Sequence, residues 1–278
     1  MMQLFHTLSE ECSRLTTEKY STSFASAIRL LHKDLRQAIH GIYGFVRLAD
    51  EIVDSFHEHA QAELLEEFES ETYLAIERKI SLNPILNSFQ RVVHNYSLDL
   101  LQLRAFFKSM RMDLHHQQYV RDLYEEYIYG SAEVVGLMCL SVFCEGDRRL
   151  IQKLEPAARS LGAAFQKVNF LRDLKDDHRN LNRSYFPGFD VAKFTEAKKR
   201  EIEEEIENDF AEAIAGIYGL PAKARLGVYI AYKYYLSLFY KIKKLKPSCI
   251  LAERVRIPNY RKLIILMGAG VRSQFNLM

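Results

Sequence analysis

Two stretches of the chain repeat acidic and amide side chains at helical spacing. In the first stretch the polar series steps by four, three and four residues through Tyr43, Arg47, Asp50 and Asp54. Such steps bring side chains to one side of an α-helix. Two aspartates four residues apart repel each other, and a cation beside them reverses the sign of that interaction. This face therefore indicates cation binding.

The second stretch carries Asn169, Asp173 and Asp177 at intervals of four, with Gln166 beside them. All of these ligands are oxygen atoms, which suit a hard cation such as Mg²⁺, with Mn²⁺ as the alternative. Magnesium usually takes one or two protein carboxylates and binds substrate phosphate with other positions. The second face therefore indicates a cation that is shared with a phosphorylated ligand.

Each acidic face has an arginine close to it. Arg47 precedes the first pair of acids, and Arg172 lies inside the second series. A planar guanidinium donates two hydrogen bonds at once to phosphate oxygens. The two faces together predict a magnesium and diphosphate site. Its predicted metal ligands are Asp50, Asp54, Asn169, Asp173 and Asp177.

Two other classes of protein share parts of this pattern. A di-iron or di-manganese bundle requires Glu-x-x-His on two helices, and the nearest match here is one Asp54-x-x-His57. A non-catalytic helical adaptor would place the same acids on unrelated surfaces beside lysine or arginine partners. Either face alone is also typical of a solvated helix.

Helical periodicity dominates the chain, which has only 12 glycines and 6 prolines. We expect one all-α domain over residues 1–278, because no linker or change of composition divides it. The turn formers of residues 178–191 interrupt the pattern, and residues 195–208 are charged nearly all round, as on a solvated face. The predicted helices are Phe5–Lys19, Lys33–Phe56, Ala60–Ile80, Pro84–Tyr96, Leu100–Leu114, Val120–Cys144, Asp147–Asp177, Thr195–Tyr218, Pro221–Lys246 and Tyr260–Phe275.

Composition excludes several functions. The formal net charge of +2 gives no electrostatic case for nucleic acid, and the longest apolar run, Val134–Cys144, is too short to span a bilayer. The four cysteines form no CxxC pair, so we expect reduced thiols, no zinc and a cytoplasmic location. The 16 tyrosines and 17 phenylalanines could fill a core or line a long apolar pocket.

The motifs resemble those of the squalene/phytoene synthase family over about Tyr20–Arg261. The sequence YGFVRLADEIVD at residues 43–54 resembles the first aspartate-rich motif, and QKVNFLRDLKDD at 166–177 resembles the second. NRSYFP at 182–187 is similar to the segment that follows it. The serine–phenylalanine segment at 20–24, an acid at Asp113 and a central helix break at 129–136 also have counterparts.

The resemblance implies an isoprenoid-synthase-type helical bundle around a central cavity. It implies a magnesium-dependent head-to-head (1–1′) condensation of two prenyl diphosphates. Two geranylgeranyl diphosphates giving phytoene through a cyclopropylcarbinyl diphosphate, in carotenoid biosynthesis, is the favoured reaction, and NADPH is not expected. Formation of squalene or dehydrosqualene from farnesyl diphosphate is the alternative.

The resemblance also implies roles for single residues. The implied catalytic residues are Asp50, Asp54, Asp173, Asp177, Tyr129 and Arg172. The implied substrate-binding residues are Ser21, Phe24, Tyr43, Arg47, Val134, Val135, Gln166, Asn169, Arg183, Tyr185 and Arg261.

The sequence departs from the motifs of this family at two positions, Glu133 and Glu51. Glu133 stands where relatives often have glycine and could face the cavity or point outward, whereas Glu51 lies off the acidic stripe and should matter little. Arg254 and Arg261 precede or begin the predicted helix Tyr260–Phe275, which should close the diphosphate end. That helix is apolar beside basic residues, so it could serve as core or make transient contact with a membrane surface. The sequence leaves the oligomeric state open.

Overall fold

The computed structural model describes residues 2–115, 119–180, 185–188, 194–252 and 254–255, with the backbone alone for 176–180. All regular secondary structure in this part of the chain is helical, so the predicted all-α fold is confirmed. In chain order the helices are α1 (Met2–Tyr20), α2 (Thr22–Ile28), α3 (Lys33–Ser55), α4 (Gln61–Arg78), α5 (Pro84–Tyr96), α6 (Leu100–Asp113), α7 (Arg121–Ile128), η1 (Tyr129–Glu133), α8 (Val134–Phe143), α9 (Arg148–Asn180), α10 (Glu196–Gly219), α11 (Ala222–Lys243) and α12 (Pro247–Ile250).

The predicted helices match these bounds to within a few residues, but two short helices were missed. Ser21 caps the N-terminus of helix α2, and its Oγ accepts a hydrogen bond from the Phe24 N–H at 3.2 Å. Helix α12 has four residues. Helices this short carry too little periodicity to be recognised. The predicted helix Tyr260–Phe275 lies outside the described residues.

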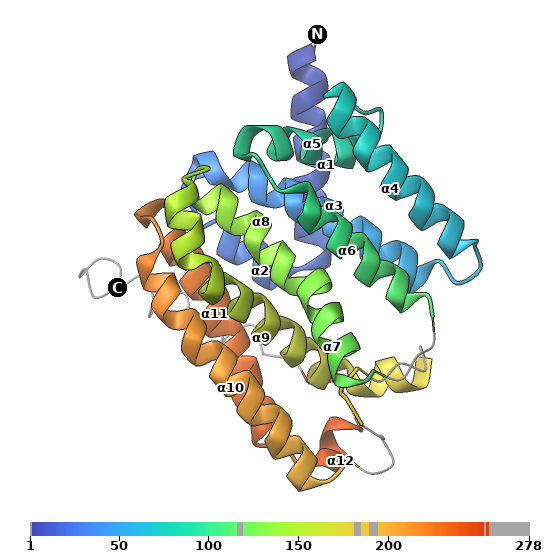
Figure 1. Cartoon of the computed structure of the whole chain (residues 1–278), viewed down its shortest axis with the longest axis vertical. Coiled ribbons are helices and arrows are strands. Elements are labelled where there is room, and N and C mark those ends of the chain that lie inside the picture. Colours follow the sequence, from blue (N-terminus) through green and yellow to red (C-terminus); the bar gives the residue numbers. More distant parts are fainter. Residues whose placement is uncertain (1, 116–118, 181–184, 189–193, 253, 256–278) are drawn as a thin grey trace.

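The α7–η1–α8 run passes through the middle of the bundle (Figure 1). The expected break at residues 129–136 takes the form of a π-helical turn, Tyr129–Glu133, which interrupts the α-helix within a continuous helical run. Gly130 permits this turn to lie on α6, since a Cβ there would be 2.0 Å from the Ser109 Oγ. The run Arg121–Phe143 is long and apolar enough to cross a membrane, but half of that stretch is buried inside the protein.

Helix α3 is anchored by the face opposite its acidic stripe. Phe45 is fully buried and stacks on Phe89 of α5 with ring centroids 3.9 Å apart. It also contacts Phe68, Phe106 and Phe107. Each such aromatic pair adds about 0.5–1.5 kcal/mol beyond the burial of apolar area. This cluster fixes the rotation of α3, so that Tyr43, Val46 and Asp50 point away from it.

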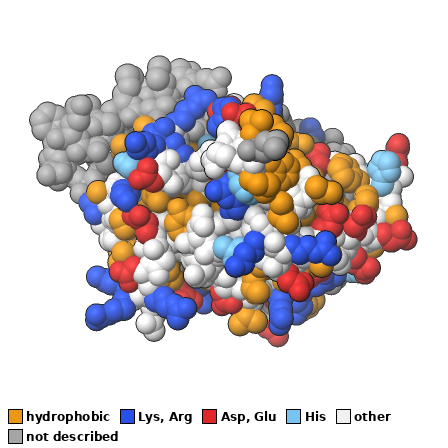
Figure 2. Space-filling view, turned by 90° about the horizontal axis from the view of Figure 1, so that it is seen from above, with side chains coloured by type: hydrophobic (Ala, Val, Ile, Leu, Met, Phe, Trp, Pro, Cys, Tyr) orange, Lys and Arg blue, Asp and Glu red, His pale blue; other side chains and the backbone are white. Residues whose placement is uncertain are grey.

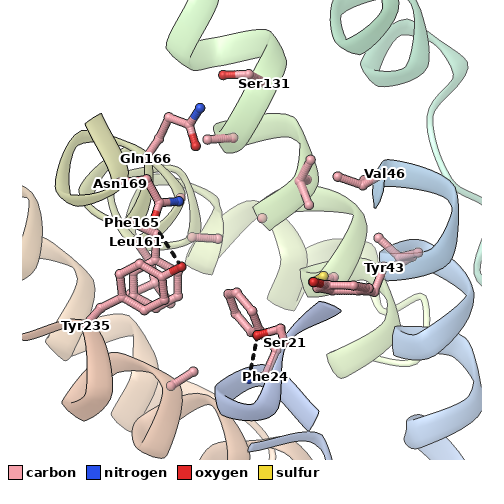
Figure 3. Close-up of a pocket in the computed structure, with 18 of the residues that line it drawn as sticks. Ser21, Phe24, Tyr43, Val46, Ser131, Leu161, Phe165, Gln166, Asn169 and Tyr235 are labelled. Carbon is pink, nitrogen blue, oxygen red and sulfur yellow. Dashed lines mark hydrogen bonds between the residues drawn. The ribbon is translucent and has the colours of Figure 1, made fainter. Parts of the chain in front are cut away.

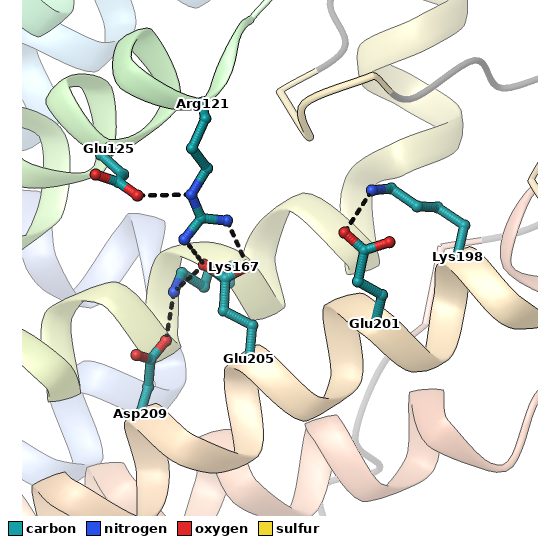
Figure 4. A network of polar contacts seen from close by, with 7 residues as sticks. All are labelled: Arg121, Glu125, Lys167, Lys198, Glu201, Glu205 and Asp209. Carbon is teal, nitrogen blue, oxygen red and sulfur yellow. Dashed lines mark hydrogen bonds and ion pairs between the residues drawn. The ribbon is translucent and has the colours of Figure 1, made fainter.

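Helix α9 is held from behind by an ion network with α10 and α7 (Figure 4). The buried Lys167 ammonium lies 2.6 Å from Glu205 and 2.7 Å from Asp209, and Arg121 also pairs with Glu205. The expectation that residues 195–208 form a solvated face is therefore wrong in part. Removing one member of a buried pair leaves an uncompensated charge, which is strongly destabilising.

The surface at the end of the molecule that holds the start of α1 is seen in Figure 2. Lysine and arginine side chains are mixed there with aspartate and glutamate, and apolar side chains lie between them. Among the exposed apolar residues of this part of the chain are Leu4 and Leu8 of α1. Mixed charge of this kind agrees with the formal net charge of +2.

We expect His40 to make the fold sensitive to acid. His40 is buried, its Nδ1 lies 2.9 Å from the Thr17 Oγ1, and burial lowers its pKa from 6.5 to about 4. Below pH 6.5 the folded protein therefore binds fewer protons than the unfolded chain does. The contribution of neutral His40 to the free energy of unfolding is complete above pH 6.5 and is lost as the pH falls toward 4. Urea unfolding should show a loss of about 1–2 kcal/mol between pH 7 and pH 5.

The variant His40→Gln should lose that part of the pH dependence. His57→Gln, at an exposed position just after α3, is the matched control and should keep the wild-type dependence. Equal pH dependence of the unfolding free energy in wild type and His40→Gln would contradict the assignment.

Candidate active site

A pocket of about 620 Å³ lies between α2, α3, the α7–η1–α8 run, α9, α10 and α11. Figure 3 shows Tyr43 and Val46 of α3 on one side and Gln166 and Asn169 of α9 on the other. One end of the pocket is polar and carries the acids of both helices. The remainder is apolar, and this division suits a ligand with a charged head and a long hydrocarbon chain.

Helix α3 contributes Asp50 and Asp54 to the polar end. Burial, and then the neighbouring Asp54, raise the pKa of Asp50 from 3.8 to about 8, although Arg47 opposes the change. Without a cation, this end of the pocket thus disfavours ionisation of Asp50 beside Asp54. A bound divalent ion would reverse that preference.

Arg47 lines the pocket together with these acids. It forms an ion pair with Glu51, and its guanidinium lies 4.3 Å from the centroid of the Tyr20 ring. Glu51 lies off the acidic stripe, but it follows Arg47 by four residues and forms this ion pair with it. The Arg47 Nε has no hydrogen-bond partner among the described residues, so it remains available to a ligand.

Helix α9 contributes Asn169, Arg172 and Asp173. Asp173 pairs with Arg172 and with Arg254, whose Nε lies 2.7 Å from the Asp173 Oδ1. Arg254 therefore lies at the polar end of the pocket. The sequence predicted this position for the basic residues that precede the expected helix Tyr260–Phe275. In the free protein two guanidinium groups balance this carboxylate.

A second carboxylate layer borders the polar end from α6. The buried Asp113 accepts hydrogen bonds from the hydroxyls of Tyr127, at 2.8 Å, and Tyr185, at 3.0 Å. Tyr185 stacks on Phe170 of α9 with ring centroids 4.1 Å apart. These contacts tie the segment that holds Tyr185 to α6 and α9, beside the acids.

Aromatic rings form the wall just inside the polar end. Phe165 and Tyr235 stack with centroids 3.9 Å apart, and Phe24 lies 5.8 Å from Tyr235. The Tyr235 hydroxyl donates to the Asn169 Oδ1 at 3.3 Å (Figure 3). Ring faces exclude water and attract a cation, so this wall can protect and stabilise a positively charged carbon.

The donor set fits magnesium that is shared with a ligand. Asp50 and Asp54 on one helix and Asn169 and Asp173 on another offer oxygen atoms only, the kind of ligand Mg²⁺ prefers. Within the described residues, no three His, Cys, Asp or Glu side chains are close enough to hold an ion alone. Phosphate oxygens of a substrate would therefore complete the coordination.

Comparison with known proteins identifies the family. The sequence profile described as "Squalene/phytoene synthase" matches residues 17–261. The chain belongs to the squalene/phytoene synthase family. It is therefore an enzyme, a prenyltransferase of the head-to-head type. An adaptor is excluded, although Asp173 does have the arginine partners that an adaptor would show.

Individual relatives agree with this assignment. The chain is 26% identical to the phytoene synthase of Arthrospira platensis over 96% of its own length and 94% of the relative. It is 25% identical to the 15-cis-phytoene synthase of Pantoea ananas, over 90% and 87%. Its fold resembles that of a dehydrosqualene synthase crystallised with a ligand, with a TM-score of 0.81, 21% identity and coverage of 97% and 98%.

Most of the predicted site residues line this one pocket. Those from the N-terminal half are Ser21, Phe24, Tyr43, Arg47, Asp50, Asp54 and Val135, and those from the C-terminal half are Gln166, Asn169, Arg172, Asp173 and Tyr185. Arg183 and Arg261 lie outside the described residues, as does the side chain of Asp177. The roles of all of these residues stay predictions.

Two predicted residues require correction. Val134 is fully buried in the core rather than on the pocket, and Tyr129 is not among the residues that line it. Tyr129 instead faces α9, with the Arg159 guanidinium 5.2 Å from its ring. The tyrosine of the α7–η1–α8 run that lines the pocket is Tyr127. The π-helical turn after it adds a residue per turn and thereby changes which side chains face inward.

Glu133 points away from the pocket. It pairs with Arg159 of α9 at 2.5 Å and is not among the lining residues. The sequence left two orientations of Glu133 open, and the structure shows the outward one. The unusual carboxylate ties the π-helical turn to α9 and leaves the charge of the pocket unchanged.

Sequence reasoning missed several lining residues. Phe165 lies four residues before Asn169 and shares its side of α9. That spacing was the available signal. Tyr235 and Ser131 carried no such signal, because tertiary packing alone brings them to the pocket.

Proposed function

We propose that this enzyme condenses two geranylgeranyl diphosphates head to head to phytoene, in a magnesium-dependent reaction of carotenoid biosynthesis that passes through a cyclopropylcarbinyl diphosphate. One observation carries the proposal: the acid-bearing faces of α3 and α9 meet at the polar end of one otherwise apolar pocket. The names of the relatives from Arthrospira platensis and Pantoea ananas support phytoene as the product.

Residues at different depths of the pocket would have different roles in the reaction. Arg47, Arg172 and Arg254 lie at the polar end, where guanidinium groups can bind diphosphate oxygens. The rings of Phe24, Phe165 and Tyr235 border the space just inside, where a bound chain would carry its first carbons. Loss of diphosphate from one substrate leaves an allylic cation there, and the rings shield it from water. The double bond of the second substrate then attacks the cation, and loss of a proton closes the ring of the cyclopropylcarbinyl diphosphate, which keeps the second diphosphate.

The acids define where the metal would act. Asp50, Asp54, Asn169 and Asp173 would hold Mg²⁺, together with Asp177 by prediction from the sequence. When bound, the ion neutralises the charge of the departing diphosphate. Asp113 holds the hydroxyls of Tyr127 and Tyr185, and so keeps this end of the pocket in shape.

Product analysis tests the proposal. Purified enzyme is incubated with C15 or C20 diphosphate and Mg²⁺, with and without NADPH, and hydrocarbons are identified. We expect phytoene from the C20 substrate, no requirement for NADPH, and loss of product after chelation that added Mg²⁺ or Mn²⁺ restores. Dehydrosqualene or squalene from the C15 substrate alone would overturn the choice of substrate, and activity unaffected by chelation would overturn the metal.

We further propose that the enzyme works in the cytoplasm and touches a membrane surface transiently. Its proposed product has no polar group, and transfer of each CH₂ from water to an apolar phase is favourable by about 0.8 kcal/mol. Co-sedimentation with anionic liposomes should therefore be detectable at low salt and weaker at high salt. Absence of binding, together with activity that is indifferent to lipid, would contradict membrane contact.

A further inference from the structure

Ser131 is a pocket residue whose hydroxyl has no use within the free protein. It lines the pocket from the π-helical turn η1, and its Oγ is buried without a hydrogen-bond partner in the described part of the chain. A buried polar atom without a partner destabilises the protein unless a ligand or water satisfies it.

Ser131 differs from other serines in the helices of this protein. Serine and threonine side chains within helices commonly donate to the carbonyl four residues earlier. The hydroxyls of Ser9, Ser26, Ser141 and Ser160 do so at 2.7–3.1 Å. Ser131 does not.

The reason lies in the packing of η1 on α6. The carbonyl four residues before Ser131 belongs to Tyr127, and it accepts a hydrogen bond from the Ser109 Oγ at 3.3 Å. Gly130 makes this approach possible, because a Cβ there would also lie 2.3 Å from the Ala105 carbonyl oxygen. The π-helical turn thus provides a hydroxyl that its own helix does not bind. Turns of this kind occur frequently at functional sites.

The depth of Ser131 in the pocket follows from the register of two helices. A Cβ on Gly162 of α9 would lie 2.6 Å from the Ala132 carbonyl oxygen, so Ser131 is level with this part of α9. Gln166 lies one turn from Gly162 toward Asn169, and Figure 3 shows Ser131 and Gln166 at the same end of the pocket. The Gln166 amide also makes no hydrogen bond to any described residue. Two polar side chains therefore mark the inner limit of the polar end.

We propose that the Ser131 hydroxyl, beside Gln166, donates a hydrogen bond to a diphosphate oxygen of the bound prenyl substrate. The inference rests on the proposed function and adds a binding residue to it. A hydrocarbon chain at this depth would leave both polar groups unpaired, whereas a diphosphate oxygen forms a charge-assisted bond with the hydroxyl. The bond to the leaving group then lies where the polar and apolar parts of the pocket meet.

The experiment compares a ligand that has the diphosphate with one that lacks it. Affinities of wild type and Ser131→Ala are measured for an unreactive C20 thiodiphosphate with Mg²⁺ and for geranylgeraniol. We expect Ser131→Ala to bind the thiodiphosphate about tenfold more weakly, a change of about 1.4 kcal/mol, and geranylgeraniol as tightly as wild type does. Ser131→Thr, which keeps a hydroxyl, should retain most of the affinity for the thiodiphosphate.

Ser141→Ala is the matched control. Ser141 lies on the same helical run, is not among the pocket-lining residues, and donates to the Leu137 carbonyl. It should leave both affinities unchanged. Equal weakening of both ligands by Ser131→Ala, or no weakening of either, would overturn the role of Ser131 while wild-type binding and turnover leave the proposed function intact. Failure of the wild type to bind the thiodiphosphate would overturn both.

Discussion

Replacement of Asp50 by asparagine should lower turnover by about 10³-fold and make the metal-free protein more stable. The loss of turnover follows because a neutral amide holds the metal ion more weakly than a carboxylate does, and that ion stabilises the leaving diphosphate. Such electrostatic contributions are worth about 10²–10³ in rate. The gain in stability follows from burial and from Asp54, which together raise the pKa of Asp50 to about 8. The ionised carboxylate therefore destabilises the free fold increasingly as the pH rises from 3.8 toward 8.

Two measurements on Asp50→Asn test these effects together. Steady-state turnover should fall while the thermal midpoint without metal rises, and the further rise on adding Mg²⁺ with an unreactive diphosphate should disappear. Asp34→Asn is the matched control, because Asp34 is an exposed acid on the same helix, outside the pocket. Its turnover and its response to Mg²⁺ should equal those of the wild type. Wild-type turnover in Asp50→Asn would contradict the metal site.

Local periodicity predicted the parts of the site that a single helix determines. The stripe Tyr43, Arg47, Asp50 needs only helical geometry, and the structure places all three on the pocket. The rotation of that helix about its axis could not be read from the stripe. It is set by Phe45 and its aromatic neighbours on α5 and α6, which are contacts between distant parts of the chain.

Irregular geometry explains why the wrong tyrosine was assigned to the pocket. A sequence read at 3.6 residues per turn cannot register the extra residue of the π-helical turn, so Tyr129 was assigned to the pocket that Tyr127 lines. The ion pair between Arg47 and Glu51 is a different case, because a spacing of four residues on a regular helix is visible in the sequence. The position of Tyr127 needed the structure, whereas this ion pair could have been predicted.

The apolar end of the pocket offers a test of substrate length. Small residues from α9, α10 and α11 line it, namely Ala157, Ala158, Ala213, Gly216, Gly227 and Ala231. Small side chains leave space where larger ones would fill it. A C20 chain extends one five-carbon unit further from its diphosphate than a C15 chain does. If the chain lies along the pocket, the end that these residues line accommodates the last unit.

Ala213→Leu should therefore shift the preference of the enzyme from C20 toward C15 diphosphate by about 60-fold. Ala213 is fully buried and lines the pocket, so the three added carbons occupy space that the end of the longer chain would use. Displacing about three CH₂ groups at about 0.8 kcal/mol each costs about 2.4 kcal/mol, or about 60-fold in kcat/KM. The measurement is the ratio of kcat/KM for the two substrates in one preparation, in which any loss of stability from overpacking cancels. Ala215→Leu, two residues along the same helix at an exposed position, is the control and should keep the wild-type ratio. An equal loss for both substrates in Ala213→Leu would show that the hydrocarbon chain does not reach this end of the pocket.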